Sequence, residues 1–234
     1  MRLLVLIFGA SIGSFTFCLL TSFRNKEKFW HFCQRGSFCP FCKHSLKWFD
    51  LIPILSYLLL FGRCRYCHRV FGKSYLLWEL GFASLFLYAY CEWGLSLFSF
   101  LFLAYCILLI VLSYWDLLYL SVHLFLLIAF LFLQGLSLWL GLVQFDYSTF
   151  LFCIVLSCFL YYFYKDGMGL ADYFFIICSA MSLSFAKLAI YFFLASTSAL
   201  IVCLFQSPDR RISKVSLPFL PFLCFAFFLC QFIL

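Results

Sequence analysis

Charge is scarce in this 234-residue chain. Asp, Glu, Lys and Arg make up 11% of its residues, whereas 67% are hydrophobic and the mean hydropathy is +1.09. Soluble globular domains carry about 25% charged residues, so the composition excludes that class. Alternating polar and apolar residues are also missing, which excludes a transmembrane β-barrel. We therefore expect an all-α integral membrane protein whose spans are apolar runs of about 20 residues.

The apolar runs predict about eight transmembrane helices. They cover residues 3–22, 75–91, 95–114, 120–142, 148–164, 173–186, 187–206 and 217–234. Positive charge follows the first run instead of preceding it, which favours an anchor over a cleaved signal peptide. The predicted domains are a first helix (1–22), a basic cytosolic loop (23–74) and a multi-helix membrane domain (75–234).

Basic residues gather in that loop. Ten of the 16 Lys and Arg lie between Arg24 and Lys73. The positive-inside rule places such a loop in the cytosol, and orientation alone accounts for the charge without a nucleic-acid partner. Eight spans then leave both termini outside, and the loop with Arg210, Arg211 and Lys214 inside. Lys187 is the one basic residue that this eight-span topology places in an outer loop.

Two close cysteine pairs stand in the loop, Cys39-Pro-Phe-Cys42 and Cys64-Arg-Tyr-Cys67, with twenty-one residues between them. This spacing suits a four-thiolate zinc site, and in a reducing compartment metal binding is favoured over a disulfide. The alternative is that these four cysteines bind no metal. Most other cysteines lie singly in apolar runs, where a thiol acts as a small hydrophobe. Further candidate ligands are His31, Cys33, His44 and His68.

Three of the nine acidic residues lie where apolar segments meet the predicted cytosolic face: Asp116, Asp166 and Asp172. Two adjacent carboxyl groups can share a proton, so that one activates water and the other acts as an acid. Asp116 and Asp172 are the predicted catalytic pair. Asp166 can replace either on this evidence, and polar anchoring of helix ends is the non-catalytic alternative.

The other acids receive simpler interpretations. Glu92 and Asp146 fall in short outer loops, where a solvated charge is expected. Glu79 follows the basic loop near the start of a helix and is expected to face a partner. Within the loop, the apolar stretch Asp50–Gly62 is too short to span and contains Pro53. We expect it to lie at the membrane interface or to pack on the membrane domain.

The loop closely resembles one known family. Its sequence is Cys39-Pro-Phe-Cys-Lys-His-Ser-Leu-Lys-Trp-Phe-Asp-Leu-Ile-Pro-Ile-Leu-Ser-Tyr-Leu, closing on Gly62-Arg-Cys-Arg-Tyr-Cys67. This pattern resembles the bacterial prepilin peptidases, which are type IV leader peptidases of the GxGD aspartic class. Gly13-Ser-Phe15 and Tyr75–Glu79 are also similar to the family pattern.

The resemblance implies that Asp116 is the first catalytic aspartate and Asp172 the second. The second lies in Gly169-Leu-Ala171-Asp172, where Ala171 replaces the family's second Gly and Gly169 supports the loop. A Pro usual after the first aspartate is missing, and Phe17 stands where the family has Asn. These departures suggest a divergent branch, such as the competence-pseudopilin type of Gram-positive bacteria.

The resemblance also implies a bacterial cytoplasmic-membrane enzyme that cleaves prepilin or pseudopilin leaders at the cytosolic face. N-methylation of the new terminus with S-adenosylmethionine would be a second activity, and zinc would be structural. The rival hypothesis is a non-enzymatic membrane scaffold, or a small transporter, whose zinc loop binds a partner. A transporter would be expected to show inverted repeats and acids at the bilayer midplane, and the chain shows neither.

Overall fold

The computed structural model describes residues 1–24, 36–163, 168–206 and 218–233, and helices dominate them. Within these ranges the only strand-like pairings are two isolated bridges, Phe38–Ser45 and Arg63–Val70. The elements in chain order are α1 (Arg2–Arg24), η1 (Trp48–Leu51), α3 (Leu55–Leu59), α4 (Ser74–Trp93), α5 (Leu97–Tyr119), α6 (Leu124–Trp139), α7 (Tyr147–Phe163), α8 (Leu170–Ser179), α9 (Phe185–Gln206) and α10 (Leu220–Phe232). The predicted all-α class is confirmed.

Each of the eight predicted apolar segments overlaps one of the longer helices. In the part of the chain that is described, α1, α5 and α9 are long and apolar enough to cross a membrane. The helices α6, α7, α8 and α10 are apolar but shorter. These features agree with an integral membrane protein, and the total of eight spans stays a prediction.

Two helix boundaries differ from the predicted ones in a way that matters for the site. The run 95–114 was expected to end before Asp116, but α5 continues to Tyr119. Polar Ser113 does not interrupt the helix, because its hydroxyl donates to the carbonyl of Leu109 at 2.7 Å. Helix α8 begins at Leu170, three residues before the predicted segment. Asp116 and Asp172 therefore both lie inside helices.

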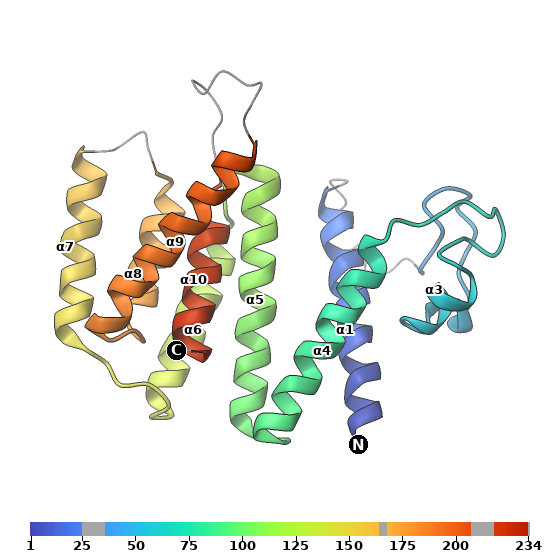
Figure 1. Cartoon of the computed structure of the whole chain (residues 1–234), viewed down its shortest axis with the longest axis horizontal. Coiled ribbons are helices and arrows are strands. Elements are labelled where there is room, and N and C mark those ends of the chain that lie inside the picture. The colour runs from blue at the N-terminus through green and yellow to red at the C-terminus, as the bar shows by residue number, and fades with distance from the viewer. Residues whose placement is uncertain (25–35, 164–167, 207–217, 234) are drawn as a thin grey trace. The chain divides into compact units, whose positions relative to one another are not determined.

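The chain divides into two compact units, Met1–Leu103 and Ala104–Leu234. In the first unit α1 packs along α4 (Figure 1). Gly9 and Gly13 make this approach close: a Cβ on Gly13 would lie 2.9 Å from the carbonyl oxygen of Trp78. Small residues four positions apart allow such contact between helices in lipid.

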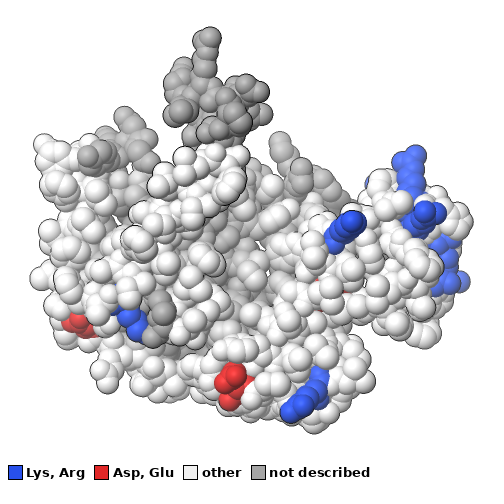
Figure 2. Space-filling model, in the orientation of Figure 1, with Lys and Arg blue, Asp and Glu red and all other residues white. Residues whose placement is uncertain are grey.

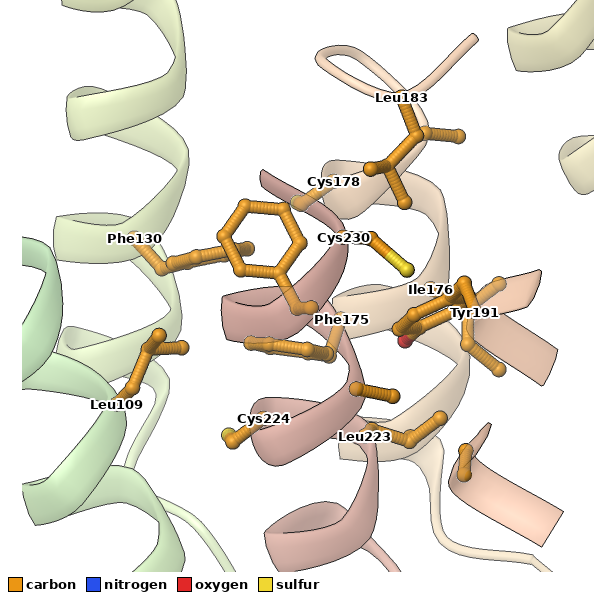
Figure 3. Packing of buried hydrophobic residues seen from close by; sticks show 14 of the residues in the cluster. Leu109, Phe130, Phe175, Ile176, Cys178, Leu183, Tyr191, Leu223, Cys224 and Cys230 are labelled. Carbon is orange, nitrogen blue, oxygen red and sulfur yellow. The ribbon is translucent and has the colours of Figure 1, made fainter. Parts of the chain in front are cut away.

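The second unit is built around α8, which contacts α6, α7 and α10. Its core joins side chains from several helices, among them Phe130, Phe175, Tyr191 and Leu223 (Figure 3). The rings of Phe130 and Phe175 stack with centroids 4.5 Å apart. Helix α8 is short, and it is the element through which α6, α7 and α10 share one core.

Lys187 has a structural role at the end of α10. Its ammonium group donates to the backbone carbonyl of Cys230 at 3.0 Å. Carbonyls in the last turn of a helix lack partners within the helix, and a cation there is favoured by the helix dipole. The basic residue that the topology prediction left in an outer loop is thus accounted for locally. Arg210, Arg211 and Lys214 lie outside the described residues.

Candidate metal centre and carboxylate pair

The two cysteine pairs adopt the same turn twice. Lys43 N–H donates to the Cys39 carbonyl at 2.9 Å, and His68 N–H donates to the Cys64 carbonyl at 3.0 Å. The residue after each pair is left-handed, with φ of 59° at Lys43 and 56° at His68. In each turn the first cysteine is buried. The repeated geometry directs two thiols from each turn to a common point.

All four thiols gather there. The ligand atoms of Cys39, Cys42, Cys64 and Cys67 lie within 4.8 Å of one another, and the Sγ atoms of Cys39 and Cys67 are 3.9 Å apart. Tetrahedral zinc, with Zn–S bonds of about 2.3 Å, places its sulfurs about 3.8 Å apart. The residues therefore fit a structural zinc ion held by four sulfurs, as the spacing predicted.

Burial and backbone hydrogen bonds both act on the pKa of the Cys64 thiol. Burial acts to raise its pKa, but backbone hydrogen bonds from Cys67 and Tyr66 bring the pKa down to about 7. A thiolate is the form that binds metal. His44 and His68 are not in the cluster, and His31 and Cys33 lie outside the described residues. The four paired cysteines are thus the set that the structure brings together.

Glu79 of α4 forms a hydrogen bond with the loop. Its Oε2 accepts a 2.7 Å hydrogen bond from the backbone N–H of Ile54, and Glu79 is 8% exposed. Ile54 has a φ of 62°, an unfavourable conformation for a β-branched residue. The buried carboxylate holds the chain in this strained turn, and Ile54 is the partner expected for Glu79.

A cavity of about 550 Å³ lies between α1, the loop and α4. Its lining includes Ser14 from α1, Arg63 and Arg65 from the loop, and Glu79 from α4. Cavities of this size are typical of small-molecule sites. The first unit therefore contains a candidate ligand site besides its metal centre.

Asp116 occupies the last turn of α5 and is 8% exposed. Its Oδ2 is buried without a hydrogen-bond partner. The backbone of Leu220, the first residue of α10, lies within hydrogen-bonding reach of the carboxyl group. A buried carboxyl oxygen without a partner is costly, and such groups mark candidate functional sites.

Asp172 is the third residue of α8 and is 7% exposed. Its Oδ2 accepts a 3.2 Å hydrogen bond from the backbone N–H of Gly169, the residue that caps the helix. This arrangement fixes the carboxyl group at the helix N-terminus. Ala171 lies within the same first turn, where the backbone is helical and a methyl group is tolerated. The change from Gly is therefore compatible with this backbone.

The fold brings the two acids together from separate helices of the second unit. Their carboxyl groups are close enough to interact electrostatically. Cys224 of α10 lies within electrostatic range of both acids, and Ser113 is its hydrogen-bonding neighbour. Sequence reasoning missed Cys224, because a lone cysteine in an apolar run carries no signal of its neighbours. Asp166, the alternative acid, lies outside the described residues.

Comparison with known proteins finds a family match within the first unit. Residues 7–93 match the model of the Bacterial Peptidase A24 N-terminal domain. The prepilin leader peptidase/N-methyltransferase of Vibrio cholerae is 43% identical over 54 residues, which cover 23% of this chain and 21% of that protein. The first unit is thus similar to the N-terminal domain of the bacterial prepilin peptidases.

Other relatives align over longer stretches. The Bacillus subtilis prepilin leader peptidase/N-methyltransferase is 34% identical over 113 residues, or 48% of this chain and 44% of the relative. The Legionella pneumophila protein of the same name is 29% identical over 224 residues, which cover 84% of this chain and 71% of that protein. Alignments with the first relatives span only 21% and 18% of their lengths. No solved structure matches the chain.

Proposed function

We propose that this chain is a membrane aspartic endopeptidase that removes the leader from type IV prepilins or pseudopilins. The observation that carries the proposal is the pairing of Asp116 and Asp172, two buried carboxyl groups that distant segments bring within electrostatic range. Similarity to known proteins supports the substrate class, since the curated relatives bear the name prepilin leader peptidase/N-methyltransferase.

The carboxyl pair works as an acid and a base. One ionised carboxylate takes a proton from a water molecule, whose oxygen attacks the carbonyl carbon of the scissile peptide bond. The other carboxyl group, protonated at the start, gives its proton to the carbonyl oxygen. As the carbon–nitrogen bond breaks, the carboxyl group that took the proton of water gives it to the leaving amine, and the other carboxylate regains its proton from a hydroxyl group of the tetrahedral intermediate. Because one group must be ionised and one protonated, we expect a bell-shaped dependence of kcat/KM on pH.

The proposed setting is the bacterial cytoplasmic membrane, crossed eight times with both termini outside. The basic loop and the carboxyl pair then face the cytosol, in accordance with the positive-inside rule. A prepilin leader that is short and basic stays on the same side for the same reason. Cleavage at this edge of the membrane separates the leader from the apolar helix that follows it.

Zinc has a structural role in this proposal. Four thiolate ligands leave no open position for water, so the metal holds the two turns of the loop together and takes no part in hydrolysis. Asp116 and Asp172 supply the chemistry without it.

The decisive test is leader cleavage in membranes. A pseudopilin precursor is co-expressed with the wild-type protein, Asp116→Asn or Asp172→Asn, and the shift to the mature length is followed on gels. We expect each variant to lose activity by at least about 10²-fold, because each removes one acid–base group. Glu92→Gln, which changes an exposed acid near the end of α4, is the matched control and should cleave normally.

The alternatives make different predictions. If both variants retain cleavage at wild-type abundance, the pair is not catalytic and Asp166 becomes the next acid to change. If the wild-type protein leaves every such precursor intact, the scaffold or transporter hypothesis replaces the peptidase.

A second activity, N-methylation, is favoured by the cavity in the first unit. S-adenosylmethionine would supply the methyl group for the new amino terminus. The cavity volume of about 550 Å³ suits this ligand, and Arg63 in its lining would hold the ligand's carboxylate. The test is the mass of the mature N-terminal peptide, which methylation raises by about 14 Da, a methyl replacing a hydrogen.

A further inference from the structure

The loop of the first unit carries an exposed apolar stripe that no part of the described fold covers. Six large side chains form it, with exposed fractions from 45% to 86%: Trp48, Leu51, Leu55, Leu58, Leu59 and Phe61. They lie on the two short helices η1 and α3 and at Phe61, two residues after α3. Such surfaces on soluble domains mark protein or membrane contacts.

The two short helices give the stripe a defined geometry. In α3, Leu55, Leu58 and Leu59 lie three and four positions apart and share one face. The opposite face, with Ser56, Tyr57 and Leu60, lines the cavity. In η1, Trp48 and Leu51 lie three positions apart, which aligns them in a 3₁₀ helix. The contact between η1 and α3 joins the two sets.

The orientation of the stripe is fixed by the turn that precedes α3. Ile54 is held in its strained conformation by the 2.7 Å hydrogen bond to Glu79 of α4. Backbone strain of this kind persists only where the surroundings enforce it. The outward direction of α3 is therefore set by an anchor on a membrane-domain helix, and does not result from loose packing of the loop.

The charges around the stripe are basic. Asp50 is the one acid between residues 36 and 73, and its 3%-exposed side chain pairs with Arg65 at 2.8 Å. Lys47, next to Trp48 in sequence, and Arg63, two residues after Phe61, are exposed. Most of the visible Lys and Arg side chains lie over this loop, at the right of Figure 2. Uncompensated positive charge beside apolar side chains suits an anionic phospholipid surface.

We propose that η1 and α3 dock the loop on the anionic surface of the bilayer. The six apolar side chains enter the boundary between headgroups and acyl chains, and Lys47 contacts lipid phosphates. The loop is within reach of that surface, because α3 lines the same cavity as α1, a helix long and apolar enough to cross the membrane. Docking holds the cavity, which the other face of α3 lines, at the height of the membrane interface.

Quenching of Trp48 fluorescence tests the docking. The full-length protein is placed in nanodiscs with anionic lipids, either unmodified or brominated near the headgroup end of the acyl chains. The spectrum of Trp48→Phe is subtracted from that of the wild type to isolate Trp48. We expect brominated lipid to lower this difference about twofold or more, and aqueous iodide to have little effect, as for interfacial side chains.

Matched variants identify the surface responsible. Trp139, 81% exposed on the apolar helix α6, is the positive control for lipid contact. The double variant Leu58→Ser, Leu59→Ser should lose the Trp48 quenching. Val70→Ser changes an apolar loop residue of similar exposure, 63%, outside the stripe, and should keep it. Equal zinc content in all variants shows that the loop remains folded.

Other outcomes overturn the proposal. Strong quenching of Trp48 by iodide would mean that the stripe faces water. Protection from both quenchers would mean that protein covers it, either the second unit or another copy of the chain. A photo-crosslinking residue at position 58 distinguishes the cases independently: we expect adducts to lipid, and adducts only to protein would contradict docking.

Discussion

At the residue scale, single buried contacts decide what the polar groups of this protein do. Glu79 lies near the start of a helix, and its carboxylate accepts a hydrogen bond from the backbone N–H of a loop residue twenty-five positions earlier. Lys187 likewise serves one carbonyl at the end of α10. Both contacts join segments that are distant in sequence, which is why the residue types alone predict a partner without naming it.

Removing the Glu79 carboxylate should loosen the loop. Glu79→Ala leaves the Ile54 N–H without its acceptor and should destabilise the loop by about 1–3 kcal/mol, the cost of an unsatisfied buried group. The rate of limited proteolysis within residues 36–73 measures this opening. Glu79→Gln keeps an acceptor oxygen and is the control. Equal proteolysis of the Ala variant and the wild type would show that the contact does not hold the turn.

Asp146 is a cap rather than a simple solvated charge. It accepts hydrogen bonds from the hydroxyl groups of Ser148 and Thr149 and from the backbone N–H of Ser148 at the start of α7. The hydroxyl of Ser148 contributes most to lowering the pKa of Asp146, to about 2. Its stabilising effect is therefore present above about pH 4, the ordinary range of an aspartate, and is lost as the pH falls through about 2.

Acid titration of unfolding checks this cap. Asp146→Asn should lower the thermal midpoint at neutral pH, and the difference from wild type should close between about pH 4 and pH 2. Glu92→Gln, at an exposed acid near the end of α4, should change the midpoint little at any pH. A constant difference across the range would assign the effect to something other than the charge.

At the element scale, the closest packing in the first unit is between α1 and α4. Gly13→Leu adds a side chain where even a Cβ would lie 2.8 Å from the Phe82 side chain. Overpacking of this kind should cost about 1–3 kcal/mol. Thermal unfolding in detergent measures the loss. Gly81→Leu, at a glycine of α4 with nothing within 4 Å of the added Cβ, is the matched control. Equal stability of the two variants would contradict the close approach.

At the scale of the whole molecule, the metal centre belongs to one unit and the carboxyl pair to the other. Chelation of zinc should make the loop sensitive to protease, while helical content measured by circular dichroism changes little, because the longer helices do not depend on the metal. Cys39→Ser or Cys64→Ser should lower protein abundance for the same reason. Normal abundance of an inactive variant would contradict a structural role for zinc.

The sequence by itself determined the elements of this protein. Apolar runs separated by polar residues specify helices in lipid, because every backbone group must be bonded within its own segment. The two Cys-x-x-Cys pairs specified the metal ligands, since a thiol pair at this spacing forms its turn locally. Helix ends were predicted less well: α5 extends past Asp116, because Ser113 bonds within the helix and does not stop it.

Only the tertiary structure decided which residues meet. Asp116 and Asp172 were chosen from three candidate acids, and their proximity depends on how the helices of the second unit pack, which no local pattern encodes. The placement of Cys224 beside them and of Glu79 beneath Ile54 has the same origin. So does the outward face of α3, because a run of leucines does not reveal which of its sides the rest of the fold will cover.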